Sequence, residues 1–220
     1  MREALWWRKQ RLWDAELAEA SVGVGEHVRL IMEEAYQHAM MDRIIDVAPG
    51  DEPGAWQVWL ETDQGKFRSD TPAFHARVGI MIRRRGLLAN LSLRENLLLP
   101  FLYHGDAARI ARAEQEVEAV ADFLGLWDVL DEQAGERSNY THALLSLGRC
   151  MLMHPAIIVA QEIHVGMSPE RQMHFRDLAI EALRQLGSGL LYLTSTEYEG
   201  SGVHFDRTLV LQAQAVQGMA

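Results

Sequence analysis

The spacing of apolar residues along the chain predicts strands that alternate with helices. Two short segments, Trp56–Leu60 and Lys66–Arg68, form a predicted hairpin around Asp63-Gln64-Gly65. Residues 156–160, AIIVA, are apolar throughout, which is typical of a strand covered on both faces of a parallel sheet. Further strands are predicted at His27–Met32, Arg77–Ile82, Gly189–Thr194 and Thr208–Leu211.

Longer segments have apolar residues at helical spacing. Residues 107–124 place their apolar side chains on one stripe, with glutamates largely on the other side. Ser92 and Glu95 form a capping-box pattern at the start of a helix, and Pro100 is predicted to end that turn. Other helices are predicted at Ala35–Val47, from an N-cap at Ser138 through Met153, and at Pro169–Leu186.

This order of elements predicts a single α/β domain spanning residues 1–220. Strands that alternate with helices form a mainly parallel sheet between helical layers. The hairpin segments give the domain a β-rich edge near its N-terminus. The helical section at about residues 90–137 interrupts the alternation, so we expect a separate helical subdomain there.

Composition narrows the classes of function. The formal net charge is −10, from 21 Lys and Arg against 31 Asp and Glu, so we expect no nucleic-acid partner. Cys150 is the single cysteine, which rules out an intrachain disulfide. The first residues carry charges among apolar side chains, unlike a signal peptide, and no apolar run approaches the roughly 20 residues of a membrane span. From these two features the chain is predicted to be cytoplasmic. The nine histidines show no metal-site spacing, so no metal is expected.

Three segments resemble the ATP-binding subunits of ABC transporters. They are RVGIMI…GLLANLSLRENLLLP, HALLSLGRCMLMHPAIIVAQE and LLYLTSTE…FDRTLVLQ. The resemblance extends from about Val22 to Leu211 and implies a P-loop NTPase fold of the ABC ATPase kind. The first segment is most similar to subunits of Mla-type lipid transporters.

The resemblance places the phosphate loop, G-x-x-x-x-G-K-S/T, on residues 32–39. Met32 and Gln37 then replace the two glycines, His38 replaces the lysine, and Ala39 replaces the hydroxyl residue that binds magnesium. Glu33 and Glu34 add negative charge, and a carboxylate about 4 Å from a phosphate repels it by about 4 kcal/mol. An ordinary strand–helix connection without a ligand explains the same residues, although a protonated His38 would partly imitate lysine.

The other functional positions of the family also depart from its pattern. The glutamine that contacts magnesium and the attacking water falls on Arg83, and the magnesium-binding aspartate on Gln161. The general-base glutamate is retained as Glu162. The following loop aspartate and the switch histidine fall on Ser168 and Ser195. The signature L-S-G-G-Q falls on Arg137, Ser138, Asn139, Tyr140 and Thr141, where the serine alone matches.

These departures predict a degenerate, non-catalytic subunit without a cofactor of its own. Gln161 and Ala39 give magnesium neither an anionic oxygen nor a hydroxyl, and phosphoryl transfer depends on such positioned charge. The resemblance implies that the chain pairs with a second ABC ATPase subunit or with itself. It also implies a transmembrane permease partner, which would hold the chain peripherally at the inner membrane. Mg-ATP would then bind only in a composite site with a partner.

A contact with that permease is predicted for one loop. Arg83, Arg84 and Arg85 precede Leu87 and Leu88 in the segment that faces the membrane partner in the resembled family. A solvated turn explains the same sequence. Two other functions stay open: a soluble scaffold or regulator that retains the fold, and an enzyme with new chemistry. The candidate catalytic groups of such an enzyme are Glu33, Glu34, His38 and Glu162.

Overall fold

The computed structural model of the chain describes residues 3–8, 10–12, 15–45, 58–82, 87–104, 107–135, 137–198 and 202–213. Its centre is a five-stranded sheet with the strand order β11-β5-β10-β9-β8, and all neighbouring strands are parallel. The strands are β5 (His27–Ile31), β8 (Val78–Ile82), β9 (Ile157–Gln161), β10 (Gly189–Thr194) and β11 (Arg207–Val210). The five predicted parallel strands are therefore confirmed, with bounds shifted by a residue or two.

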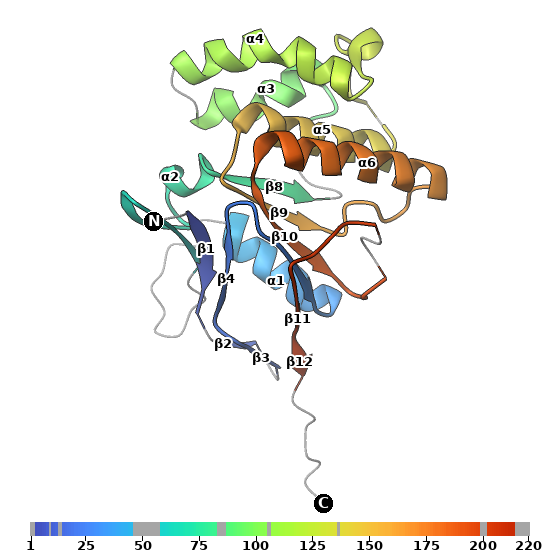
Figure 1. Ribbon diagram of the computed structural model, residues 1–220. Coiled ribbons are helices and arrows are strands. Elements are labelled where there is room, and N and C mark those ends of the chain that lie inside the picture. Colours follow the sequence, from blue (N-terminus) through green and yellow to red (C-terminus); the bar gives the residue numbers. More distant parts are fainter. Residues whose placement is uncertain are drawn as a thin grey trace, which may run out of the picture.

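One face of this sheet is covered by α5 (Asn139–Met153) and α6 (Pro169–Leu186), as Figure 1 shows. Alternate residues of a strand point to opposite faces. Accordingly, Ile158 and Ala160 of β9 pack in the core beneath the two helices, whereas Ile157 and Val159 belong to the core on the opposite side. Every residue of β9 is buried, as the apolar run at 156–160 predicts for a strand covered on both faces.

The opposite face is covered by α1 (Glu34–Ile45) and by an antiparallel sheet near the N-terminus. That sheet has the order β4-β1-β6-β7, with Leu5 and Trp7 of β1 fully buried in the core. Its strands are β1 (Ala4–Trp7), β4 (Ala20–Gly23), β6 (Val58–Thr62) and β7 (Gly65–Arg68). The predicted hairpin is confirmed for β6 and β7, with its turn at Asp63 and Gln64, while Trp56 lies outside the described residues. Three short strands, β2 (Gln10–Leu12), β3 (Ala15–Leu17) and β12 (Gln212–Ala213), form a small antiparallel sheet.

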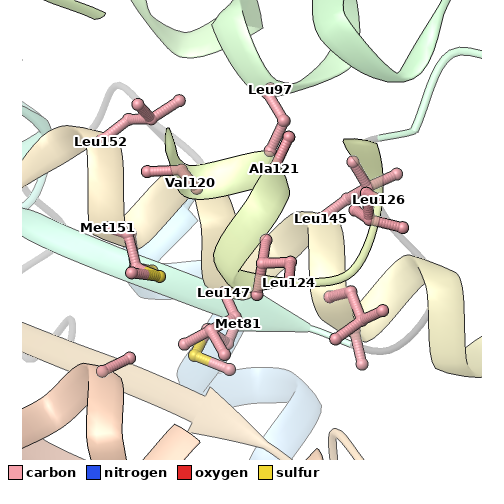
Figure 2. Close-up of a cluster of buried hydrophobic side chains, with 14 of the residues drawn as sticks. Met81, Leu97, Val120, Ala121, Leu124, Leu126, Leu145, Leu147, Met151 and Leu152 are labelled. Carbon is pink, nitrogen blue, oxygen red and sulfur yellow. The ribbon is translucent and has the colours of Figure 1, made fainter. Parts of the chain in front are cut away.

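Beside α5, on its side away from the parallel sheet, lie α3 (Leu93–His104), α4 (Ala107–Phe123) and the short 3₁₀ helix η1 (Trp127–Val129). The short helix α2 (Pro72–His75) lies instead near the antiparallel sheet, against β7 and β8. Figure 2 shows Leu97 of α3, Ala121 of α4 and Leu147 of α5 in one apolar cluster. Gly148 lets α5 pack closely against Leu97 and Leu124. A Cβ at this position would lie 2.6 Å from a methyl of Leu97 and 2.8 Å from one of Leu124.

Helix α3 begins at the predicted capping box but extends beyond its predicted end. The capping box is confirmed, because the Ser92 N–H donates to Glu95 Oε2 at 2.7 Å and the Glu95 N–H donates to Ser92 Oγ at 3.1 Å. The prediction that Pro100 ends the turn is wrong: α3 continues through Pro100 to His104. A proline inside a helix has no N–H, so the carbonyl four residues earlier loses its helical donor. Another donor can then satisfy that carbonyl.

Candidate functional site

The carboxyl ends of the parallel strands bring distant parts of the chain together at one edge of the sheet. Met32 follows β5, and its N–H donates to the carbonyl of Thr194 at the end of β10 at 2.9 Å. The Glu162 N–H, just after β9, donates to the carbonyl of Leu193 at 3.3 Å. Ligand sites of open parallel sheets lie at this edge. The structure thus assembles the segments that the resemblance marks as functional.

Gln37, Glu162 and Ser195 are hydrogen-bonded to one another at this edge, and we call them the amide cluster. Gln37 is fully buried in α1. Its Nε2 lies 3.1 Å from Glu162 Oε1 and 3.0 Å from Ser195 Oγ, and it also donates to the Met32 carbonyl at 3.0 Å. Ser195 Oγ in turn donates to Glu162 Oε1 at 2.5 Å. Three positions implied to bind phosphate, activate water and sense the nucleotide therefore bond to each other.

The orientation of the Gln37 amide follows from its neighbours. If the amide were reversed, its oxygen would face the Met32 carbonyl and the Glu162 carboxylate, which are both acceptors. In the observed orientation Gln37 Oε1 is buried and has no hydrogen-bond partner among the residues that the structure describes. A buried acceptor without a partner costs about 1–3 kcal/mol. The side chain accepts this cost because the contacts of its Nε2 with Met32, Glu162 and Ser195 hold it in this orientation.

The backbone at Glu162 has an uncommon conformation that helps to build the amide cluster. Its φ angle is +38°, in the left-handed region that disfavours residues with a Cβ. This conformation costs a non-glycine residue about 1–2 kcal/mol. It turns the chain immediately after β9, so that the carboxylate reaches Gln37 and Ser195. Such strain is common at functional positions, which makes Glu162 a candidate functional residue.

His38 lies on a different side of α1 from Gln37. Its Nε2 is 3.9 Å from Glu34 Oε1, and both side chains are 59% exposed. Glu33 is exposed as well. The structure therefore places the candidate groups of a new enzyme at the solvent-facing start of α1, while Glu162 bonds within the amide cluster.

Gln161 and Ser168 have positions that fit structural roles. Gln161 is the last residue of β9 and is 8% exposed. Ser168 is the N-cap of α6: its Oγ accepts from the backbone N–H of Arg171 at 3.4 Å and donates to Glu170 Oε2 at 3.1 Å. Ser and Asp are both preferred N-cap residues, so a serine here retains the capping function of an aspartate.

The residues at the signature position form the start of α5. Ser138 is confirmed as the N-cap, with its Oγ accepting from the Thr141 N–H at 3.4 Å. Asn139 Nδ2 lies 3.5 Å from the carbonyl of Val165 in the loop after β9. The first turn of α5 is thus attached to the segment that follows Glu162.

Tyr140 attaches the same turn to α6. Its hydroxyl is hydrogen-bonded to Nδ1 of His174, and the guanidinium of Arg171 lies 5.5 Å from the centroid of its ring. Burial raises the pKa of the Tyr140 phenol. These contacts were not foreseen from the sequence, because nothing in the spacing of His174 and Arg171 points to Tyr140.

The structure describes part of the segment predicted to contact a permease. Arg83, Arg84 and Arg85 lie outside the described residues. Leu87 packs against the core beneath α5, and Leu88 is 41% exposed. The buried Asn96 holds Leu88 in place: its Oδ1 accepts from the Leu88 N–H at 2.9 Å, and its Nδ2 donates to the Leu88 carbonyl at 3.0 Å.

Within the described ranges, no group of three or more His, Cys, Asp or Glu side chains is arranged to hold a metal ion. In the same part of the chain, none of the helices combines the length and the apolar character that crossing a membrane requires.

Comparison with known proteins identifies related sequences. No model of a known protein family matches the chain. The chain is 26% identical over 139 residues to the lipoprotein-releasing system ATP-binding protein LolD of Syntrophus aciditrophicus, covering 63% of this chain and 59% of that protein. LolD of a Jannaschia species is 26% identical over 195 residues, with 88% and 84% covered. The Nod factor export ATP-binding protein I of Burkholderia orbicola is 33% identical over 129 residues, with 57% and 40% covered.

Solved structures share the fold. The cbiO1 protein of Clostridium perfringens, part of the ABC transporter complex cbiONQ, has a TM-score of 0.73 at 12% identity, covering 97% of this chain and 86% of that one. An ATP-binding cassette of an ABC transporter in its ADP conformation has a TM-score of 0.68 at 19% identity, with 88% and 82% covered. The chain therefore has the ABC ATPase fold, and its sequence identifies it as a relative of ABC transporter ATP-binding proteins. Because the relatives described here are named for lipoprotein release and Nod factor export, the narrower Mla-type branch stays a prediction.

Proposed function

We propose that the chain is a non-catalytic, ATPase-type subunit of an ABC transporter complex. The amide cluster is the observation that supports this proposal. In it, Gln37, which the resemblance aligns with the second phosphate-loop glycine, bonds to Glu162 and Ser195. A glycine at this position leaves backbone N–H groups open to phosphate. We infer that the Gln37 side chain, which bonds to Glu162 and Ser195, leaves no such opening here.

The charges near the amide cluster also disfavour a bound nucleotide. Glu33 and Glu34 supply carboxylates at the start of α1, and His38, at the lysine position, pairs with Glu34 on the exposed side of that helix. Ala39 has no hydroxyl and Gln161 has no anionic oxygen for magnesium. Phosphate and metal would both lack their opposite charges, so hydrolysis would have no metal to position the attacking water.

The proposed role of the chain in a transporter complex requires that it pairs with a second ATPase-type subunit. The cbiO1 structure is described as part of an ABC transporter complex, and we infer that this chain likewise pairs, with an active ATPase subunit or with itself. Ser138 caps α5, whose N-terminus carries a partial positive charge and would face a nucleotide held by the partner. The contacts of Tyr140 with His174 and Arg171 keep that turn in one position. Mg-ATP would then be bound by the partner, with this chain completing the site.

Association with a membrane would come through a permease. The chain would be cytoplasmic and peripheral at the inner membrane, with Leu88 and the adjoining arginines as part of the contact. Lipoprotein or lipid transport is the substrate class that the LolD relatives suggest.

The proposal is tested by calorimetric titration of Mg-ATP into the isolated chain, with a complete ABC ATPase subunit as positive control. We expect no binding tighter than about 100 µM, which corresponds to about −5.5 kcal/mol. We also expect Glu162→Gln to leave any trace ATPase activity of the preparation unchanged. Tight magnesium-dependent binding, or ATP hydrolysis that Glu162→Gln abolishes, would show that the site is active.

A further inference from the structure

A cavity of about 520 Å³ lies between α6 and the parallel sheet, on the face opposite α1. Ile158 and Ala160 of β9 and Leu190 of β10 form its floor, and residues of α6 such as Phe175 and Ala179 form a wall. Pockets that hold small molecules have volumes of about 300–1,000 Å³ and are mostly apolar. The size and the lining of this cavity both match that class.

The cavity has a second wall, formed by the chain after β10. Tyr198, Val203 and Phe205 line it from this side. Arg29 of β5 holds this wall, because its guanidinium lies 5.1 Å from the Phe205 ring centroid and donates to the carbonyl of Glu197 at 2.5 Å. Arg29, which does not line the cavity, therefore ties this wall to the sheet from outside.

The polar side chains that line the cavity include neutral groups, such as Gln172 and Tyr192, and the cation Arg176. Arg176 and His164 line it, and no carboxylate is among its described lining residues. His164 Nδ1 is hydrogen-bonded to the Tyr192 hydroxyl at 2.7 Å, which fixes the ring against the sheet. The Arg176 guanidinium donates to Asp177 Oδ1 at 3.1 and 2.9 Å, from a residue that does not line the cavity. Arg176, paired with Asp177, is therefore the permanently charged group among the described residues that line this mostly apolar cavity.

The entrance is marked by apolar side chains that remain exposed. Met173 on α6 is 56% exposed, and Tyr198 on the opposite wall is 79% exposed. Both also line the cavity. Small side chains at Ala160 and Ala179 create the space inside, since larger residues there would fill it. The combination is an open, mostly aliphatic cavity with a cationic group in its wall.

We propose that this cavity binds an anionic amphiphile, with an aliphatic chain between α6 and the sheet and a carboxylate or phosphate head group at Arg176. Apolar surface drives binding of the chain, and a charge-assisted hydrogen bond selects the head group. The site is separate from the amide cluster, so the proposal stands whether or not the chain binds nucleotide.

The test uses the full chain and three ligands with the same ten-carbon tail: decanoate, decanol and decyltrimethylammonium. Calorimetry should detect saturable binding of one decanoate per chain, with decanol weaker and decyltrimethylammonium weakest. Decyl phosphate distinguishes the two head groups, since tighter binding of one identifies the preferred anion. Equal affinity for anion and cation, or no saturable binding of decanoate, would overturn the proposal.

Variants locate the site. Ala179→Phe fills the cavity and should weaken decanoate binding by at least about tenfold, equivalent to 1.4 kcal/mol. Gln185→Phe adds the same ring to α6 at a position that does not line the cavity and should bind like the parent chain. Arg176→Gln should weaken decanoate but not decanol. If Ala179→Phe does not fold, Met173→Glu at the exposed entrance gives the same test by repelling the anion.

The variants also separate a ligand site from a protein contact. If Ala179→Phe binds decanoate as tightly as Gln185→Phe, the ligand lies elsewhere and the proposal is wrong. If no decanoate binds and Ala179→Phe instead abolishes self-association in sedimentation experiments, the cavity receives a side chain of a second copy, which also overturns the proposal.

Discussion

Arg149 Nε donates a hydrogen bond to the backbone carbonyl of Asn96 over a distance of 2.7 Å. In a regular helix that carbonyl accepts from the N–H of residue 100, but Pro100 has no N–H. Arg149, on α5, therefore replaces the bond that Pro100 removes from α3. Burial lowers the pKa of Arg149 to about 10, so the contact comes at a cost in desolvation.

The bond predicts thermodynamic coupling between Arg149 and Pro100. Arg149→Met keeps an unbranched aliphatic side chain but removes the guanidinium, which leaves the Asn96 carbonyl without its donor. It should lower the free energy of unfolding by about 1–3 kcal/mol. In a Pro100→Ala background the new N–H at residue 100 can bond to that carbonyl. The loss from Arg149→Met should then be smaller by about 1 kcal/mol. Urea unfolding of the four proteins gives the coupling.

The test is whether the effects of the two substitutions on the free energy of unfolding add. If the two substitutions are strictly additive, the Asn96 carbonyl does not depend on Arg149, and Pro100 is accommodated in another way. Arg112→Met is the matched control, because Arg112 is exposed on α4 and pairs with Glu116 at the surface. It should shift stability by no more than about 0.5 kcal/mol in either background.

Cys150 predicts a loss of stability at alkaline pH. It is fully buried beside Gly79, where a Cβ would lie 2.8 Å from Cys150 Sγ, and burial raises the pKa of the thiol from 9 to about 12. Since the folded pKa is the higher one, the contribution is complete below about pH 9 and is lost as the pH rises toward 12. One pH unit in this window costs about 1.4 kcal/mol.

The measurement compares the parent chain with Cys150→Ala between about pH 8 and pH 10. Both proteins share every other titrating group, so the difference isolates the thiol. The parent chain should lose about 1 kcal/mol more than the variant. Parallel pH profiles would mean that the Cys150 thiol has the same pKa in the folded and the unfolded chain, so that burial does not raise it.

The elements with clear local signals are those that the sequence predicts best. The bounds of α6 agree with the prediction at both ends, because Ser168 caps its start and Gly187 ends it in a left-handed conformation. β10 agrees as well, as an apolar run after a glycine. The short strands β2 and β3 and the helix α2 were not predicted individually, since segments of three or four residues have too little periodicity.

The candidate site was predictable as a set of positions but not as a set of contacts. The resemblance places Gln37, Glu162 and Ser195 at functional positions, and the order of parallel strands explains why they meet at one edge. That Gln37 bonds to both others depends on side-chain direction within α1, which sequence spacing does not fix. Likewise, Pro100 is a helix-ending signal by itself, and its tolerance depends on Arg149, which lies far away in the sequence.

Rebuilding the phosphate loop tests whether Gln37 blocks it. The triple variant Gln37→Gly/His38→Lys/Ala39→Ser restores glycine, cation and hydroxyl and removes the amide cluster. It should gain at least about tenfold in affinity for Mg-ATP by calorimetry. The double variant His38→Lys/Ala39→Ser keeps Gln37 and should bind no better than the parent chain. An equal gain in affinity by the double and triple variants would mean that charge, and not the amide cluster, keeps nucleotide out.

Leu88 and the preceding arginines predict a contact with a membrane-bound partner. An apolar side chain that is 41% exposed, on a backbone held at both its N–H and its carbonyl by Asn96, is suited to anchor a partner without reordering the loop. Leu88→Asp, or glutamate at Arg83, Arg84 and Arg85 together, should reduce co-purification with a permease from detergent-solubilised membranes.

Val210→Asp is the control for that experiment, because Val210 is 57% exposed on β11, a different element. It introduces the same charge and should leave the yield of permease unchanged. Leu88→Asp should shift the free energy of unfolding by no more than about 0.5 kcal/mol, so that lost binding cannot be assigned to unfolding. Undiminished recovery of the permease with Leu88→Asp and with the triple arginine variant would identify this segment as a solvated turn.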